Sequence, residues 1–298
     1  MLSAQGLMKS YGNQKILADV ILDLEKGEII SVVGSSGSGK TTLLRLISGL
    51  EKPDSGQIIL NNKVLNGGNT FTPPEKRDCS LVFQDYALFP NMSVQQNIYF
   101  GKNSVDNKKN IEQLIQITGI ANIMEKYPHQ CSGGEQQRVA LVRSLAINPS
   151  LILMDEPMSN LDSNLKTNMT RLIREILKKL GTTAIIVTHD IMDAMDMSDR
   201  IAVLDEGKIM QIGEPEEVYK NPQSKKIALL FGETNFIPLD MFPTSRSKFF
   251  DAETNEHLIS IRPGHFILPD EHTASGPKVF VGEIVSLRKI ATDYKIKL

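Results

Sequence analysis

Apolar residues along most of the chain form short continuous runs that alternate with segments of helical spacing. The runs at Ile29–Val33, Leu151–Asp155 and 184–188 have the length of strands buried on both faces of a sheet. The segments at 41–48 and 161–180 place apolar residues every three to four positions, as an amphipathic helix does, and a glycine follows each of them. Strands that alternate with helices in this way predict an α/β fold with a largely parallel sheet covered on both faces.

Two other kinds of segment interrupt this alternation. Residues 4–30 and 56–65 are rich in β-branched and aliphatic side chains and predict paired strands, the second pair forming a hairpin. Residues 91–130 carry apolar side chains at helical spacing and few strand signals. Because a further helix is predicted at 135–147, we expect a helical subdomain over about 88–147.

The pattern changes again beyond about residue 230, where short apolar runs are separated by Pro and Gly. We therefore expect a core domain over 1–230 and a small all-β appendage over 231–298. The predicted strands of the appendage are 258–261, 266–268, 279–286 and 294–297.

Composition narrows the functional classes. The chain has 298 residues, a formal net charge of −2 and 41% hydrophobic residues, which is ordinary for a globular protein and gives no sign of a nucleic-acid partner. The longest apolar runs are too short to span a membrane, and the N-terminus lacks the pattern of a signal peptide. Cys79 and Cys131 are too few for a disulfide framework or a zinc site, so a reducing cytoplasm is expected. A role at a membrane would require a partner.

The loop after the first buried strand carries the strongest chemical signal. It matches G-x-x-x-x-G-K-[ST] in full and lies between a predicted strand and a predicted helix, as a phosphate-binding loop does. Its glycines let backbone N–H groups point at phosphate oxygens, and the helix N-terminus adds partial positive charge. Lys40 is expected to hold the β- and γ-phosphates, and the Thr41 hydroxyl to bind Mg²⁺. The predicted nucleotide-binding residues here are Gly34, Ser35, Ser36, Gly37, Ser38, Gly39, Lys40, Thr41 and Thr42.

Two carboxylates, Asp155 and Glu156, end the second buried strand. A strand end beside a phosphate-binding loop is where Mg²⁺ is held, and Asp155 suits that role. Glu156 is then expected to face the γ-phosphate and to polarise a water molecule. Taken alone, the pair could equally begin a surface loop; the phosphate-binding loop in the same chain favours the chemical role.

Ser132-Gly133-Gly134-Glu135 precedes the predicted helix at 135–147. Ser-x-x-Glu is the pattern of a helix capping box, and the glycines would then simply form a turn. The same segment could instead present helix N–H groups to a second phosphate. These two interpretations are compatible, because a capped helix start can still bind an anion.

Three single residues are weaker candidates. His189 follows the strand at 184–188 and should lie near the phosphates, although a lone histidine at a strand end is often structural. Gln84 follows a short strand at 81–83 and could merely be solvated. Tyr11 lies in the first strand region and could simply pack.

In this order, these segments resemble the motifs of ABC transporter ATPases over residues 4–230. Residues 81–101, reading LVFQDYALFPNMSVQQNIYFG, are similar to the family's Q-loop and the start of its helical subdomain. Residues 131–135 stand at the signature motif, 159–162 resemble the D-loop and 187–190 the H-loop. The signature departs from the commonest Leu-Ser-Gly-Gly-Gln: Cys131 and Glu135 replace Leu and Gln. Glu keeps the capping box, and Cys is apolar enough to pack.

The resemblance implies a P-loop core that binds ATP with Mg²⁺ and hydrolyses it to ADP and phosphate. It implies that Tyr11 stacks on adenine and that Gln84 contacts Mg²⁺ and senses a membrane partner. It also implies that His189 contacts the γ-phosphate and that Glu156 is the general base. Two copies of the chain would close head-to-tail over two ATP molecules. The residues implied to touch the γ-phosphate of ATP held by the second copy are Ser132, Gly133 and Gly134.

The resemblance further implies a solute importer. Its expected partners are two membrane permease subunits and, indirectly, a solute-binding protein, and its expected location is the cytoplasmic face of the inner membrane. Residues 231–298 resemble, more weakly, the oligonucleotide-fold appendage of importer ATPases for maltose, polyamines, sulfate or ferric iron. They are shorter than the usual appendage, which leaves a complete and a truncated barrel as the two alternatives. Residues 127–129, 230–233 and 262–263 look closest to the ferric-iron type.

Alternative classes are an exporter ATPase and a soluble ABC ATPase of DNA repair or ribosomes. Repair types insert a long coiled coil between P-loop and signature, whereas only about 90 residues without sustained heptads lie there in this chain. Ribosome types carry two such cassettes. For the importer, we expect an exposed groove around Gln84, Tyr86, Leu88, Phe89 and Pro90 to dock a membrane subunit. The apolar members could alternatively pack the seam of the helical subdomain.

Overall fold

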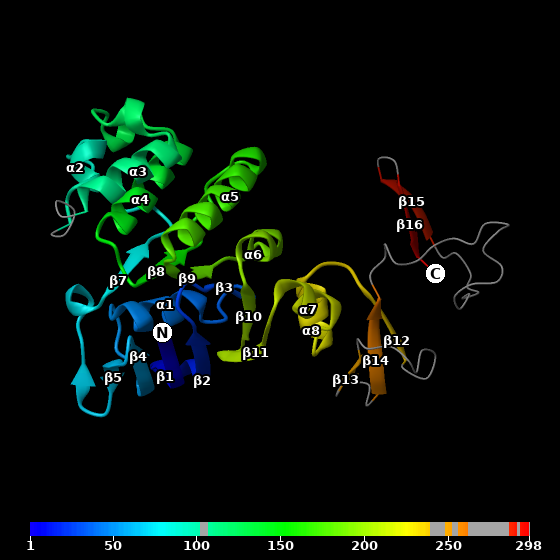
Figure 1. The fold of residues 1–298 in the computed structure, drawn as a ribbon. Coiled ribbons are helices and arrows are strands. Elements are labelled where there is room, and N and C mark those ends of the chain that lie inside the picture. Colours follow the sequence, from blue (N-terminus) through cyan, green and yellow to red (C-terminus); the bar gives the residue numbers. More distant parts are fainter. Residues whose placement is uncertain (102–106, 239–247, 252–255, 262–285, 291–292, 298) are drawn as a thin grey trace. The chain divides into compact units, whose positions relative to one another are not determined.

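The computed structural model describes residues 1–101, 107–238, 248–251, 256–261, 286–290 and 293–297 (Figure 1). The chain divides into two compact units, Met1–Ser260 and Ile261–Leu298. The predicted domain boundary after residue 230 lies upstream of this division. The three strands described between residues 235 and 261 therefore group with the first unit, apart from Ile261.

A six-stranded sheet forms the centre of the first unit, in the order β11-β10-β3-β9-β8-β7. Every neighbouring pair is parallel except β10 and β11, which form a hairpin. The predicted parallel sheet is thus confirmed, with an antiparallel edge. The strands are β3 (Ile29–Val33), β7 (Cys79–Val82), β8 (Leu151–Asp155), β9 (Thr183–Val187), β10 (Arg200–Asp205) and β11 (Lys208–Gly213).

A second, antiparallel sheet has the order β2-β1-β4-β5-β6. The turn between β4 and β5 is made by Asn61 and Asn62, which adopt φ angles of 49° and 63°. Asn tolerates this left-handed conformation, which a tight hairpin requires, so the predicted hairpin is confirmed. The strands are β1 (Leu2–Tyr11), β2 (Gln14–Leu24), β4 (Ser55–Leu60), β5 (Lys63–Gly67) and β6 (Thr70–Phe71).

Helix α1 (Lys40–Ser48) joins the two sheets. Its side chains Leu43, Leu44 and Leu46 share a buried cluster with residues of β1, β2 and β4 and with one face of the central sheet. Gly49 ends the helix in the left-handed conformation, as the sequence predicts. The buried guanidinium of Arg77 donates to the carbonyl oxygens of Leu46 and Ile47 at 2.8 and 2.7 Å, so it also caps this end.

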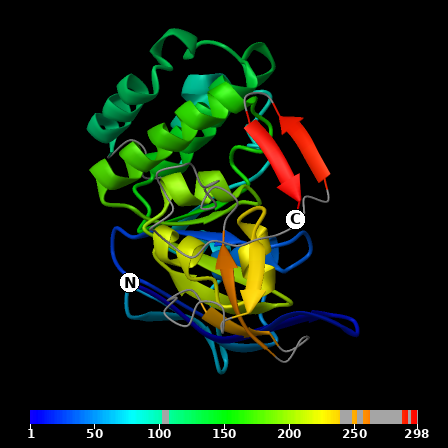
Figure 2. The same cartoon turned by 90° about the vertical axis from the view of Figure 1, so that its right-hand side faces the viewer.

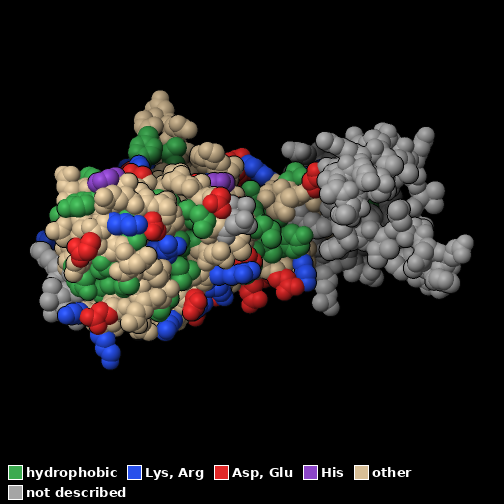
Figure 3. Space-filling view, turned by 90° about the horizontal axis from the view of Figure 1, so that it is seen from above, with side chains coloured by type: hydrophobic (Ala, Val, Ile, Leu, Met, Phe, Trp, Pro, Cys, Tyr) green, Lys and Arg blue, Asp and Glu red, His purple; other side chains and the backbone are tan. Residues whose placement is uncertain are grey.

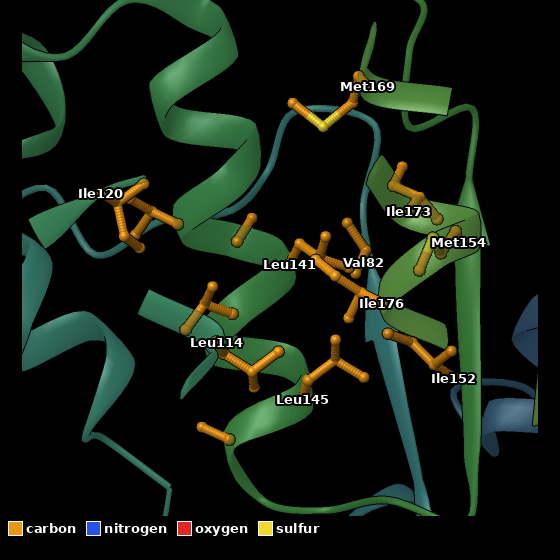
Figure 4. Close-up of a cluster of buried hydrophobic side chains, with 14 of the residues drawn as sticks. Val82, Leu114, Ile120, Leu141, Leu145, Ile152, Met154, Met169, Ile173 and Ile176 are labelled. Atoms are coloured by element: carbon orange, nitrogen blue, oxygen red, sulfur yellow. The ribbon is translucent and has the colours of Figure 1, made fainter. Parts of the chain in front are cut away.

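The opposite face of the central sheet packs against α4 (Gly133–Ala146) and α5 (Ser163–Leu180). Figure 4 shows the contact, in which side chains of α4 meet those of β8 and α5. The same cluster includes residues of α2 (Val94–Ile98) and α3 (Lys108–Thr118), so the predicted helical subdomain is present and shares a core with the sheet. Figure 2 shows these helices on the opposite side of the central sheet from β1, β2 and β4. The buried side chains labelled in Figure 4 are Val82, Leu114, Ile120, Leu141, Leu145, Ile152, Met154, Met169, Ile173 and Ile176.

The chain then forms α6 (Ile191–Met197), α7 (Pro215–Lys220) and α8 (Lys225–Leu230). A three-stranded sheet follows, with β14 (Glu256–Ile261) between β12 (Asn235–Pro238) and β13 (Lys248–Asp251). In the second unit, β15 (Ser286–Ile290) pairs antiparallel with β16 (Asp293–Lys297). The predicted strands at 258–261 and 294–297 are therefore confirmed. The strand predicted at 266–268, and nearly all of that at 279–286, lie outside the described residues.

No helix among the described residues is both long and apolar enough to cross a membrane.

Candidate functional site

The loop between β3 and α1 has a backbone that only glycine permits at two points. A Cβ on Gly34 would lie 2.0 Å from the carbonyl oxygen of Leu204, and Gly39 has a φ of 105°. Gly39 is the N-cap residue of α1 and, having no side chain, makes no side-chain cap. The first N–H groups of α1 therefore have no cap from that residue, as in a helix start that binds phosphate.

Lys40 is the first residue of α1, and its side chain contacts this loop. Its Nζ donates to the carbonyl oxygens of Gly34 and Ser35 at 2.9 and 2.8 Å, and the residue is 7% exposed. Burial lowers the pKa of Lys40, while the nearby Glu156 and Asp155 oppose that shift. The ammonium is thus hydrogen-bonded to carbonyl oxygens of the loop and lies near two acidic residues. A bound anion would replace these carbonyl oxygens as its partner.

Of the two predicted carboxylates, Asp155 ends β8 and Glu156 follows it, two strands away from β3 in the sheet. The Thr41 hydroxyl donates to Asp155 Oδ1 at 3.1 Å, which joins the start of α1 to the end of β8. Burial raises the pKa of Asp155, and the hydrogen bond from Thr41 partly offsets that rise. A partly buried carboxylate beside a hydroxyl is a donor set that suits Mg²⁺.

Glu156 has an unusual backbone for a residue with a side chain, with a φ of 46°. Its N–H donates to the Val187 carbonyl at 2.9 Å, and its own carbonyl accepts from the Ser159 hydroxyl at 3.0 Å. These bonds hold a conformation that costs about 1–3 kcal/mol elsewhere. Its carboxylate lies 3.0 Å from Nδ1 of His189.

The order of the strands explains where His189 lies. β9 lies between β3 and β8, so a residue just beyond β9 stands between the phosphate-binding loop and Glu156. Its side chain is 62% exposed. His189 thus lines the same cavity as the phosphate-binding loop, and its predicted contact with phosphate stays a prediction.

One cavity of about 490 Å³ unites these groups, except that Asp155 does not line it. It brings together the phosphate-binding loop, the carboxylate after β8, the histidine after β9 and the aromatic residue at the end of β1. Ile16 on β2 also lines it, a residue that no sequence signal distinguished from ordinary strand packing. The lining residues are Tyr11, Ile16, Ser36, Gly37, Gly39, Lys40, Thr41, Thr42, Glu156 and His189.

Tyr11 is 46% exposed at the edge of this cavity, and Lys9 Nζ lies 5.4 Å from its ring centroid. Its hydroxyl donates to the carboxylate of Glu51. Burial and this hydrogen bond raise the pKa of Tyr11. Tyr11 thus lines the cavity while remaining partly exposed, and its stacking on adenine stays a prediction.

Several predicted residues lie elsewhere. Gly34, Ser35 and Ser38 belong to the loop without lining the cavity, although the buried Ser38 hydroxyl has no hydrogen-bond partner among the described residues. Gln84 is exposed, does not line the cavity, and accepts through its carbonyl from Asn160 at 3.1 Å. Its predicted metal contact stays a prediction.

The segment at Ser132 forms the capping box that the sequence predicts. The Ser132 hydroxyl accepts from the Glu135 N–H at 3.3 Å, and the Glu135 carboxylate accepts from the Ser132 N–H at 2.7 Å. Cys131 is buried in the core below, as expected of a small apolar side chain. Gly134 lines a separate cavity of about 140 Å³ between α4 and α5, so this segment does not face the cavity at Lys40 in the same chain.

The expected docking groove needs one correction: Tyr86 is 5% exposed and belongs to the buried cluster, so it is not a surface residue. Phe89 is 36% exposed and Pro90 is exposed, whereas Leu88 is half-buried against the core. Figure 3 looks down on the molecule from the side of the helices and shows hydrophobic side chains interspersed with charged ones.

Comparisons with known proteins fit this geometry. Residues 17–159 match the model of the ABC transporter family. The Fe(3+) ions import ATP-binding protein FbpC of Fusobacterium nucleatum subsp. nucleatum is 36% identical over 299 residues, covering 95% of this chain and 80% of that protein. The putrescine transport ATP-binding protein PotG of Escherichia coli (strain K12) is 38% identical over 309 residues, covering 96% and 81%.

The fold is also similar to that of solved ATP-binding cassettes. The ATP-binding cassette MJ0796, in a dimeric post-hydrolysis state bound to ADP and Pi, matches with a TM-score of 0.62 at 30% identity, covering 72% of this chain and 99% of that one. The chain belongs to the ABC transporter family. Within that family it is an ATP-binding subunit that hydrolyses ATP.

Proposed function

We propose that this chain powers a solute importer by hydrolysing ATP with Mg²⁺ in the cavity beside Lys40. The observation that carries the proposal is the convergence in one cavity of groups from three strand ends and from the antiparallel sheet. Tyr11 would stack on adenine through its exposed ring, and Lys40 would bind the β- and γ-phosphates. Glu156 would take a proton from the attacking water, and His189, 3.0 Å away, would contact the γ-phosphate.

Magnesium fits the donors that the chain offers. Thr41 and Asp155 already lie within hydrogen-bonding distance at 3.1 Å, and the raised pKa of Asp155 indicates a carboxylate that a cation would stabilise. When bound, Mg²⁺ would neutralise charge that develops on the phosphate oxygens. Thr41 and Asp155 would hold it, with Gln84 as a further ligand after a movement of its loop.

We further propose that two copies work together. Ser132, Gly133 and Gly134 present a capped helix start that lies apart from their own nucleotide cavity, so the phosphate they suit would come from a second copy. The likeness to the dimeric MJ0796 cassette supports this arrangement. Each P-loop would then face the partner's Ser132 segment in a two-fold assembly.

The membrane partner would dock on the segment at 83–90. Phe83 and Phe89 are exposed there, at 39% and 36%. The backbone beneath is firmly held: Arg143 of α4 donates to the carbonyls of Tyr86 and Ala87 at 2.9 and 2.8 Å. A force on this segment would therefore pass to α4, whose N-terminus is the Ser132 segment.

The side chain of Asn97 completes this support. It is fully buried, donates to the Phe89 and Met92 carbonyls at 3.1 Å, and accepts from the Phe89 N–H at 2.8 Å. The segment thus combines exposed aromatic rings with a rigid base, as a docking surface should. The chain would accordingly sit on the cytoplasmic face of the membrane, bound to two permease subunits that receive solute from a binding protein.

Ferric iron is the first solute to test and putrescine the second, because relatives of comparable similarity carry these two names.

The test compares two matched aromatic sites. Phe89 and Phe71 are 36% and 38% exposed, and an arginine carbon lies 5.4 Å from each ring centroid. A Leu88→Glu, Phe89→Glu variant should remain folded and bind ATP but lose co-purification with the permease subunits. It should also lose uptake of radiolabelled iron or putrescine into reconstituted vesicles. Phe71→Glu should retain both. Full assembly and uptake by the folded double variant would refute the docking surface.

A further inference from the structure

Lys166 joins helix α5 to the segment after β9 that contains His189. The helix begins just after the 159–162 segment, where the Asp162 carboxylate caps it by accepting from the Leu165 N–H at 3.0 Å. Lys166 lies in the first turn, and its N–H donates to the Asp162 carbonyl at 2.9 Å. Its Nζ reaches away from α5 to two carboxylates, those of Asp190 and Asp193, the latter at 3.0 Å.

Those two carboxylates organise the chain directly after His189. Asp190 Oδ1 accepts from the N–H groups of Met192 and Asp193 at 2.9 and 3.3 Å, which starts α6. The Asp190 N–H in turn donates to the Thr188 hydroxyl at 3.0 Å, on the other side of His189. His189 therefore lies between Thr188 and Asp190, which this hydrogen bond joins, and Asp190 is itself held through its carboxylate by Lys166 and the start of α6.

Both ends of this contact are partly shielded from water. The side chains of Lys166 and Asp193 are 20% and 9% exposed. The Thr170 hydroxyl, one turn further along α5, donates to Asp193 at 3.3 Å. Burial alone would lower the pKa of Lys166, but its bonds to Asp190 and Asp193 outweigh that and raise it. The ammonium therefore stays charged, and its removal would leave two carboxylates side by side without their shared cation.

We infer that Lys166 is a positioning residue for hydrolysis, one that holds His189 at a fixed distance from the 159–162 segment. Lys166 does not line the nucleotide cavity, so it acts through Asp190 on the histidine rather than on ATP. The inference rests on the proposed contact of His189 with the γ-phosphate. The imidazole is 62% exposed, and among the described residues Glu156 is its polar contact, so its orientation depends on the backbone that Lys166 steadies.

Lys166→Met should lower kcat for ATP by roughly ten- to a hundredfold, since a displacement of about 1 Å in a catalytic group has an effect of that order. KM for ATP should change less than about twofold, because the residues that grip the nucleotide are untouched. Lys166→Arg should restore most of kcat, since a guanidinium can span the same two carboxylates.

The same helix offers a matched control in Lys178. Its Nζ bonds the Asp199 carboxylate and donates to the Gly27 carbonyl at 3.3 Å, so it also ties α5 to a neighbouring segment by an ion pair. Lys178→Met should therefore keep kcat within about twofold while losing a similar ion pair. An equal loss of kcat in Lys178→Met and Lys166→Met would overturn the inference, because the effect would then be general destabilisation of α5.

A double-mutant cycle separates this inference from the assigned role of His189. If Lys166 acts through the histidine, the Lys166→Met, His189→Ala double variant should be no slower than His189→Ala alone. Additive losses would overturn the Lys166 inference and leave the histidine's role intact. Near-parent turnover by His189→Ala would instead refute that role, and the inference with it. Should Lys166→Met fail to fold, Asp190→Asn breaks the same ion pair while keeping a capping oxygen, and it should show the same loss of kcat at unchanged KM.

Discussion

Glu156→Gln separates nucleotide binding from hydrolysis, because an amide keeps the size of the side chain but cannot take up a proton. The Glu156 carboxylate is 23% exposed and lies 3.0 Å from Nδ1 of His189. Loss of that one contact is worth on the order of 1 kcal/mol of stability. The variant should therefore fold and still bind ATP.

The effect on turnover should be much larger. A positioned general base contributes about 10²- to 10⁴-fold to a rate, which corresponds to roughly 2.7–5.4 kcal/mol of activation free energy. Phosphate release by the purified protein at saturating ATP measures kcat, and binding of a fluorescent ATP analogue measures affinity. We expect kcat to fall at least about a hundredfold while affinity stays within about threefold.

Glu206 supplies the control, because it has the same φ of 46° but lies in the turn between β10 and β11, with its side chain 84% exposed. Glu206→Gln makes the same chemical change at the same backbone conformation, away from the cavity, and should leave kcat unchanged. If Glu156→Gln hydrolysed ATP at the parent rate, or if both variants lost activity equally, Glu156 would not be the base.

Two further substitutions test the grip on nucleotide and the second copy. Lys40→Ala removes the P-loop ammonium and should weaken ATP binding by roughly ten- to a hundredfold and abolish turnover. Titration calorimetry measures the affinity and phosphate release measures the turnover. Unchanged affinity would argue against the P-loop assignment. Gly134→Asp, made in the Glu156→Gln protein, should prevent ATP-dependent dimers in size-exclusion chromatography, because a carboxylate would face phosphate. A Cβ there meets only Leu165 Cδ1, at 4.0 Å, so folding should survive. Gly134→Asn is the uncharged control and should dimerise better; dimers that form equally well in both would contradict the composite site.

The parts of the fold that sequence predicted are those set by local pattern. Ile29–Val33 and Leu151–Asp155 are mainly apolar runs, interrupted only by Ser31 and ended by Asp155, and both are fully or almost fully buried strands of the central sheet. The P-loop could be predicted from sequence because the conformation of its own backbone requires the glycines, without reference to a distant partner. The capping box at Ser132 is equally local, since its two hydrogen bonds join residues three apart.

Contacts between distant residues account for what sequence missed. Tyr86 looked like part of an exposed apolar loop, but Arg143, 57 residues later, binds its carbonyl, and its ring lies in the core. Glu51 as partner of Tyr11, 40 residues away, and Lys166 as partner of Asp190, 24 residues away, leave no periodic trace either. The sheet order explains the position of His189, yet that order follows from packing rather than from any motif.

Backbone strain links the nucleotide site with the proposed docking segment. Glu156, Tyr86 and Ala87 have φ angles of 46°, 63° and 44°, where glycine would avoid a cost of about 1–3 kcal/mol per residue. At Glu156 glycine would also remove the carboxylate that faces His189, so the strain is the consequence of needing an acidic side chain at that turn. Strain alone does not mark function, because the exposed Glu206 has the same φ of 46°. What distinguishes Glu156 is that its neighbours at Val187 and Ser159 hold the conformation while its side chain lines the cavity. By the same reasoning, the hydrogen bonds from Arg143 to the carbonyls of Tyr86 and Ala87 hold these two residues in backbone conformations that they would not favour alone. A surface that transmits force to α4 requires a backbone held in this way.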